Sequence, residues 1–216
     1  MKYILFIAFI LSVVSCAKHD GYTLTGLVPE AWEGKPVFLV LDDTNQPHFI
    51  DSTKISGGKF KFQGKFEVPR YCTINIYLDP NDRQTRSKII NFSLFIDSTA
   101  VEATCNYSGK HPVFQISGSG TQTEYQNYLS EIQPMEDDRS KTFHAYGEAY
   151  YSTKDLAKAI DLAKLVTEKR LAIREAKMKY LKAHPESAIS VKIAQELSDR
   201  NSDLSLKEIE GLFTSL

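Results

Sequence analysis

The hydrophobic pattern of the chain changes about halfway along its length. Between residues 22 and 117, apolar and polar side chains alternate or form short apolar runs, the two patterns typical of β-strands. They predict about eight strands, at residues 22–28, 37–41, 49–55, 59–68, 71–78, 91–97, 100–107 and 113–117. Gly57-Gly58 also predicts a tight hairpin, because glycine accepts the positive φ angles of such a turn. Short strands separated by turn residues favour an antiparallel β-sandwich or open barrel.

From residue 118 the pattern becomes helical. Thr121 and Glu124 have the spacing of a capping box, which predicts the start of a helix. We expect this helix to end near Gln133, because Pro134 cannot continue the backbone hydrogen bonding.

A longer helix is expected from residue 152 or 153 to Ala183, where His184-Pro185 ends it. Its apolar residues form one stripe, at Leu156, Ile160, Ala163, Val166, Ile173, Ala176 and Tyr180. Two shorter helices are expected at 187–198 and 205–215. The fold class predicted is therefore α+β, with a β domain at 22–117 and a helical region at 118–216 packed against it.

The first residues predict export and lipid attachment. Lys2 precedes an apolar run of about a dozen residues, too short to span a bilayer, and Ser15-Cys16 follows. We expect residues 1–15 to be a lipoprotein signal peptide, Cys16 to carry the lipid, and residues 16–21 to be a tether. The alternative is an ordinary signal peptide in which Cys16 is incidental. Lipidation places the protein in the cell envelope of a Gram-negative bacterium, on the periplasmic face or cell surface, and we expect the outer membrane.

The charge balance argues against a nucleic-acid partner. The chain has 26 Lys and Arg against 27 Asp and Glu, and removing residues 1–15 takes away only Lys2, which leaves 25 against 27. A nucleic-acid-binding protein would carry a basic stripe. An apolar content of 42% is enough for a packed core.

Two cysteines remain besides Cys16, and neither belongs to a Cys-x-x-Cys motif. Cys72 and Cys105 could form a disulfide in an oxidising compartment if their strands are adjacent. The alternative is two buried thiols that behave as small apolar side chains.

The chain contains no motif for catalysis, a metal or a cofactor, so we assign no residue to any of these. Its five histidines are isolated in sequence. Trp32 lies in a predicted loop, where an exposed ring would anchor a ligand or a partner protein and a buried ring would cap the core.

Three segments resemble a known family. Asp51–Gly64 resembles the central hairpin of an N-terminal β domain of unassigned function in envelope lipoproteins related to thiol-disulfide interchange (TlpA-like) proteins. Phe114–Thr121 is similar to that family's passage from sheet to helices, and Ala183–Ser187 is similar to its helix break. The likeness covers residues 22–212. It implies a thioredoxin-like domain with Trp-Cys-x-x-Cys after the helices, but this sequence ends where that domain would begin, so no redox role passes to Cys72 or Cys105.

These observations lead to three functional hypotheses. The first is an envelope lipoprotein that acts as a non-catalytic binding or interaction module. The second is the N-terminal recognition part of a thiol-disulfide oxidoreductase whose thioredoxin-like domain is not in this chain, with a thioredoxin-like or other envelope protein as partner. The third is a glycan-binding lipoprotein that uses an exposed Trp32.

Overall fold

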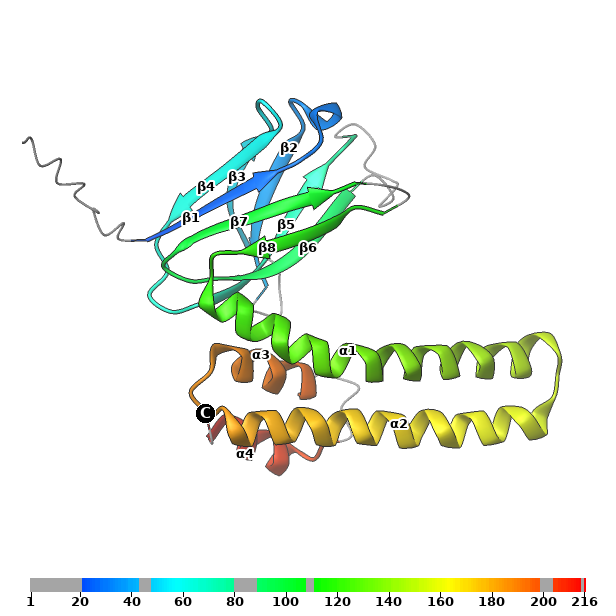
Figure 1. Cartoon of the computed structure of the whole chain (residues 1–216). Helices are drawn as coiled ribbons and strands as arrows, with labels where there is room; N and C mark the ends of the chain where they lie inside the picture. The colour runs from blue at the N-terminus through cyan, green and yellow to red at the C-terminus, as the bar shows by residue number, and fades with distance from the viewer. Residues whose placement is uncertain (1–20, 43–47, 80–88, 108–110, 199–203, 215) are drawn as a thin grey trace, which may run out of the picture.

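The computed structural model describes residues 21–42, 48–79, 89–107, 111–198, 204–214 and 216. Within these ranges the chain forms eight strands in two stacked sheets, followed by a helical region (Figure 1). The predicted α+β class is confirmed. The two sheets are separate four-stranded layers, so the β domain is a sandwich and not an open barrel.

The first sheet has the strand order β4-β1-β7-β8. Its strands are β1 (Tyr22–Leu27), β4 (Lys59–Gly64), β7 (Ala100–Asn106) and β8 (Val113–Ser117). The second sheet has the order β3-β2-β5-β6. Its strands are β2 (Pro36–Leu41), β3 (His48–Lys54), β5 (Arg70–Tyr77) and β6 (Ile89–Ile96). Neighbouring strands are antiparallel except for β1 and β7, which run parallel.

The core of the sandwich follows from the alternation of side chains along its strands. In β5 the side chains of Cys72, Ile74 and Ile76 are fully buried between the sheets, whereas Tyr71 lies on the opposite face. Because Tyr71 pairs with Phe95 in β6, two aromatic rings lie side by side on the outer face of the second sheet. This outer face is where the helices pack.

The predicted turn at Gly57-Gly58 is confirmed, but its two strands belong to different sheets. Both glycines have positive φ, 59° and 68°, and Ser56 and Lys59 form a single bridge around them. Beyond that bridge β3 pairs with β2, while β4 pairs with β1. The turn is therefore a corner between the two layers of the sandwich.

The helices form a long hairpin with two short helices packed at its base (Figure 1). The elements are α1 (Gly120–Gly147), the π-helical turn η3 (Glu148–Ser152), α2 (Leu156–Ala183), α3 (Ala188–Leu197) and α4 (Leu206–Thr214). Helices α1 and α2 are antiparallel and project together beyond the sandwich. None of the helices in the described ranges is both long and apolar enough to cross a membrane.

Pro134 does not end the first helix, contrary to the prediction, because α1 continues to Gly147. The residues of α1 and η3 that face α2 recur at alternate steps of three and four, and we call this row the α1 seam. The α1 seam consists of Tyr128, Ile132, Met135, Arg139, Thr142, Tyr146 and Ala149. Pro134 lies outside this seam and is exposed, so water can solvate the carbonyl group that loses its partner. Packing along the seam outweighs the local cost of the proline, and α1 changes direction along its length, as helices do at prolines (Figure 1).

The apolar stripe predicted for the long helix is correct in its second half and wrong in its first. The row of α2 that faces α1, the α2 seam, consists of Ala159, Leu162, Val166, Lys169, Ile173, Ala176 and Tyr180. Leu156 and Ile160 lie outside it and are 58% and 57% exposed. Residues at the contact between two paired helices recur every seven positions. The predicted stripe does not keep this repeat at the start of α2, so its first residues face away from α1.

We expect Pro134→Ala to stabilise the protein by about 1–3 kcal/mol, because alanine restores an N–H donor and is favoured in a helix interior. The free energy of unfolding would be measured by urea titration, with circular dichroism at 222 nm as the signal. Gln133→Ala, at the neighbouring exposed position, serves as the control and should change stability by less than about 0.5 kcal/mol. A loss of stability in Pro134→Ala would mean that the proline fixes a bend the hairpin needs.

Candidate functional site

The first turn of α1 attaches the helical region to the edge strand β6. Ser119 caps α1: its hydroxyl accepts a hydrogen bond from the Gln122 N–H at 3.0 Å and donates one to Asp97 at 2.7 Å. The Gln122 side chain in turn accepts a 2.7 Å hydrogen bond from the backbone N–H of Phe95, which would otherwise be an unpaired donor of an edge strand. Thr121 is therefore not the cap that the capping box predicted, because Asp97 holds Ser119 in that place.

Glu124 also has a different role from the predicted one. Since Ser119 is the cap, Glu124 lies too far along α1 to bond back to it, and its carboxylate turns toward the other helices. It accepts hydrogen bonds from the Tyr180 hydroxyl at 2.7 Å and the Ser187 hydroxyl at 2.8 Å. Burial, together with the hydrogen bond to Glu124, raises the pKa of Tyr180. One carboxylate thus connects α1, α2 and the start of α3.

Aromatic side chains fill the contact between the sandwich and the helices. The rings of Tyr71, Phe95 and Tyr125 pack together, with centroids 5.1–5.7 Å apart. The Lys192 ammonium lies 4.6 Å from the centroid of the Tyr71 ring, a cation–π contact. Apolar residues of α1, α2, α3 and α4 complete the cluster, and they include Tyr128, Ile132, Leu181, Ile189, Ile193 and Leu212.

A groove of about 500 Å³ opens beside this contact, where β5, α1 and α3 meet. This volume is within the range of small-molecule and peptide sites. Its apolar lining includes Tyr71 and Phe95 from the sandwich, with the exposed side chains of Val68 and Val191 from opposite sides. Arg70, Glu124, Glu186 and Lys192 add charges of both signs.

Two polar side chains at or beside the groove already have partners within the chain. The Ser187 hydroxyl donates its hydrogen bond to Glu124, and the His184 ring stacks on Tyr180 with centroids 4.4 Å apart. Because the Ser187 hydroxyl donates to Glu124 and not to His184, these two residues do not form a nucleophile and base pair. In the part of the chain that the structure describes, no three His, Cys, Asp or Glu side chains come together as a metal site. The groove offers an apolar surface with donors and acceptors around it.

The cysteines identified in the sequence do not lie at the groove. Cys72 is buried in β5 of one sheet and Cys105 is half-buried in β7 of the other, and both are free thiols that pack in the sandwich core. Burial raises the pKa of the Cys105 thiol, so its reactive thiolate form is disfavoured. In the structure, Cys72 and Cys105 are thus separate thiols and do not form a disulfide. Cys16 lies outside the described residues.

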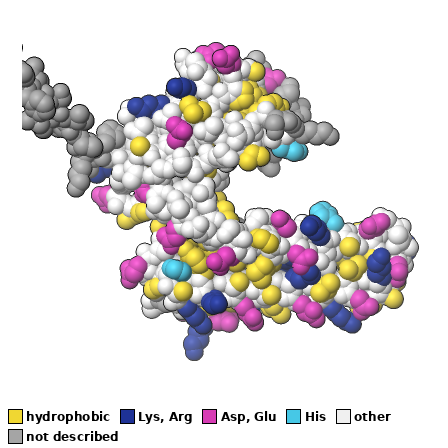
Figure 2. All heavy atoms as spheres, in the orientation of Figure 1, with side chains coloured by type: hydrophobic (Ala, Val, Ile, Leu, Met, Phe, Trp, Pro, Cys, Tyr) yellow, Lys and Arg dark blue, Asp and Glu magenta, His cyan; other side chains and the backbone are white. Residues whose placement is uncertain are grey.

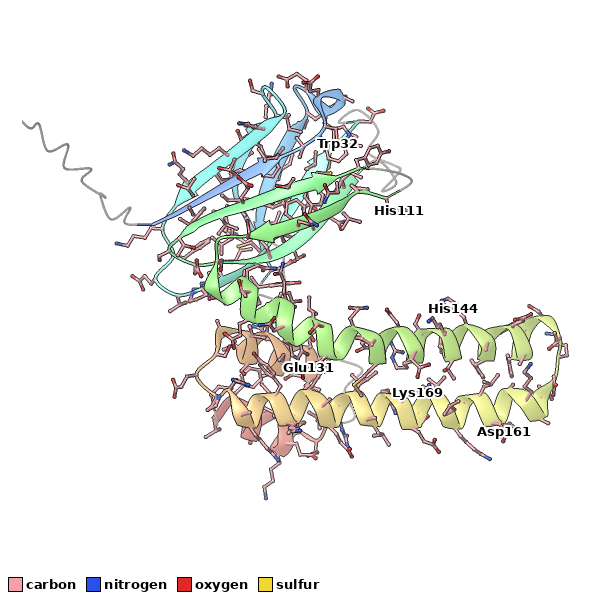
Figure 3. All side chains as sticks on the ribbon, in the orientation of Figure 1. Trp32, His111, Glu131, His144, Asp161 and Lys169 are labelled. Atoms are coloured by element: carbon pink, nitrogen blue, oxygen red, sulfur yellow. The ribbon has the colours of Figure 1, made fainter. Side chains whose placement is uncertain are left out.

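Trp32 is buried in the core, which is the second of the two alternatives that the sequence left open. It ends the short 3₁₀ helix η1 (Glu30–Trp32), is only 6% exposed, and meets the Tyr107 ring edge to face at 5.9 Å. Figure 3 labels it in the sandwich, well away from the helices. An anchor for a surface ligand needs an exposed ring, so the glycan-binding hypothesis loses the residue on which it depended.

Only one residue of the groove carries a signal in the sequence. The alternation of the strand predicted at 71–78 places Tyr71 on the face opposite Cys72 and Ile74. An aromatic residue on the outer face of a strand signals that something covers that face. Lys192 and Val191 carry no comparable signal, because only the packing of α3 against the sheet brings them to Tyr71.

The architecture defines an α+β protein in which a two-layer β-sandwich carries a helical hairpin on one outer face. Residues 22–125 match the family of a domain of unknown function, DUF4369, so a DUF4369 domain covers the sandwich and the first turns of α1. The match includes Ser119, Gln122 and Tyr125, and therefore the attachment between the two halves of the chain. The chain matched none of the curated proteins with which it was compared.

We expect Asp97→Asn to destabilise the protein by roughly 1–2 kcal/mol at neutral pH. Burial alone would raise the pKa of Asp97, but hydrogen bonds from Thr99, Ser119 and Thr121 outweigh it and lower the pKa below the ordinary 3.8. Because the pKa of Asp97 is lower in the folded state, its ionised carboxylate contributes to the free energy of unfolding above about pH 4. This contribution is lost as the pH falls through the lowered pKa. The difference between wild type and Asp97→Asn should therefore shrink below about pH 4.

Urea unfolding from pH 7 to pH 3 would measure this difference. Asp161→Asn is the control, because the Asp161 side chain is 80% exposed and has only a 3.5 Å ion pair with Lys164. A difference for Asp97→Asn that stays constant over the whole pH range would show that the ionised carboxylate is not what holds the cap.

Proposed function

We propose that the protein is an envelope lipoprotein that acts as a non-catalytic binding module, and that its groove receives a segment of a partner protein. The observation that carries this proposal is the composition of the groove, where apolar side chains of the sandwich and of α3 form one open surface. Val68 and Val191 remain exposed there although neighbouring apolar residues are buried. Exposed apolar surface inside a groove is typical of binding sites.

The charges around the groove favour a peptide segment over a purely apolar ligand. Glu186 offers an acceptor, and Lys192 offers a cation that the Tyr71 ring holds in position. A peptide backbone presents both N–H donors and carbonyl acceptors, so a groove with both kinds of partner suits it. The groove is also open along one side, which a chain passing through requires.

A photo-crosslinking residue at position 191 tests this proposal in the native cell envelope. Position 191 is 44% exposed in the groove, and position 113, which is 60% exposed on β8, is the matched control. We expect a discrete protein adduct from position 191 and none of that size from position 113. The same adducts from both positions, or no adduct from position 191, would contradict binding at the groove.

Lipid attachment to Cys16 is the second part of the proposal, and the pattern of residues 1–16 supports it. We expect the native protein to begin at Cys16 with acyl chains attached to that residue, and to partition into detergent. Cys16→Ser should move the protein to the aqueous phase, whereas Cys72→Ser and Cys105→Ser should not. A native protein without acyl mass that partitions into water would reject the lipoprotein assignment while leaving the groove untested by that result.

An alternative is that the chain is the recognition part of a thiol-disulfide oxidoreductase. Two of the segments that resemble that family lie at joints of the fold: residues 51–64 form the corner between the sheets, and residues 114–121 lead from β8 into α1. Copurification of a thioredoxin-like protein that crosslinks at position 191 would support this alternative. A native complex without any thioredoxin-like chain would count against it.

A further inference from the structure

The distal half of the helical hairpin exposes a group of large apolar side chains. They are Phe143, Tyr150, Tyr151, Leu156 and Ile160, between 42% and 67% exposed, and we call them the distal patch. Tyr146 stacks between Phe143 and Tyr150, with ring centroids 6.0 and 5.8 Å away. Figure 2 shows apolar side chains on this part of the hairpin, beyond the sandwich, with charged side chains between them.

The seven-residue repeat of the two seams places most of this patch on one side of the hairpin. Glu136 of α1 and Lys177 of α2 form an ion pair of 3.6 Å, so their positions in the repeat face the same side. Phe143 and Tyr150 occupy the position of Glu136 one and two repeats later. Leu156 occupies the position of Lys177 three repeats earlier, and Ile160 lies one turn beyond it on the same face.

The size of the patch suits a protein contact. Five large side chains, each about half exposed, leave on the order of 500 Å² of mostly apolar surface. Two such surfaces in contact would bury about 1,000 Å², the lower limit for a specific interface. Two paired helices bury only one stripe of each helix against the other. In a four-helix bundle each helix has two neighbours, so a wider part of its surface is buried.

The side of the hairpin that carries the patch is uncharged. The acidic residues of α1 lie at 124–138, before the patch, and two of them already pair with α2 in the same chain, Glu136 with Lys177 and Asp138 with Lys169. On the patch side, the repeat places only uncharged residues between positions 140 and 167: Ser140, Phe143, Gly147, Tyr150, Leu156, Ile160, Ala163 and Thr167. When two identical hairpins pack with a two-fold axis, each side meets its own copy, so a side without charge avoids repulsion between like charges.

We propose that the distal patch is the surface through which two copies of this chain associate, hairpin against hairpin, as a four-helix bundle. This contact lies on a different surface from the groove, so the proposed dimer and the proposed function are tested independently of each other. The sandwiches stay outside the bundle because the patch lies on the part of the hairpin that projects beyond them (Figure 1).

Sedimentation velocity on residues 16–216 with Cys16→Ser tests this proposal. The mass should rise with concentration from that of one chain to that of two, and high salt should not weaken the association, because the contact is apolar. Ile160→Glu should weaken it by at least about tenfold, because a charge would enter the centre of an apolar contact. Val113→Glu introduces the same charge at an equally exposed site and should leave the association unchanged. Circular dichroism at 222 nm checks that both variants keep their helices.

A protein that stays monomeric at all concentrations would overturn the proposal, and so would a dimer that Ile160→Glu leaves intact. The alternative is that the patch binds a lipid surface, because lysines flank its aromatic residues. Cosedimentation with vesicles of neutral and anionic phospholipid tests this alternative. A monomer that binds these vesicles through Ile160 would assign the patch to a lipid surface and reject the dimer.

Discussion

The attachment of α1 to β6 determines how the two halves of this protein are arranged. Ser119 and Gln122 lie in one helical turn, and both reach strand β6 or the residue after it, where Asp97 and the Phe95 N–H accept and donate their hydrogen bonds. Gly118 makes the sharp entry to this turn with a φ of 98°, and a Cβ atom there would lie only 2.1 Å from the Ala100 carbonyl oxygen. These contacts set the direction of α1, and the rest of the helical region packs on α1.

Both candidate surfaces follow from that direction. Near β6, α1 stays close to the sheet and leaves the groove between Tyr71, Phe95 and α3. Farther along, the hairpin passes beyond the sandwich, and no other described element covers its outer faces (Figure 1). The groove therefore offers a shaped site at the joint, and the distal patch offers a flat helical surface at a distance from it.

The hairpin keeps its register through polar residues in an otherwise mostly apolar contact. Arg139 occupies a position of the α1 seam and pairs with Glu136 at 3.0 Å, while Lys169 of the α2 seam pairs with Asp138. A polar residue within such a seam stabilises less than an apolar one but disfavours shifted alignments of the helices. The partners Asp138 and Lys169 come from different helices, so a shift of one helical turn would separate them.

The sequence by itself determined the element types and the place where strands give way to helices, because periods of two and of three to four residues are local properties. It also determined that Cys72, Ile74 and Ile76 share one face of a strand. Only the tertiary structure decided that α1 passes through Pro134, that Ser119 is the cap, and that Leu156 and Ile160 face outward. Each of these depends on a partner distant in sequence, α2 for the two helices and Asp97 for the cap, and local propensities worth about 1–3 kcal/mol yield to such packing.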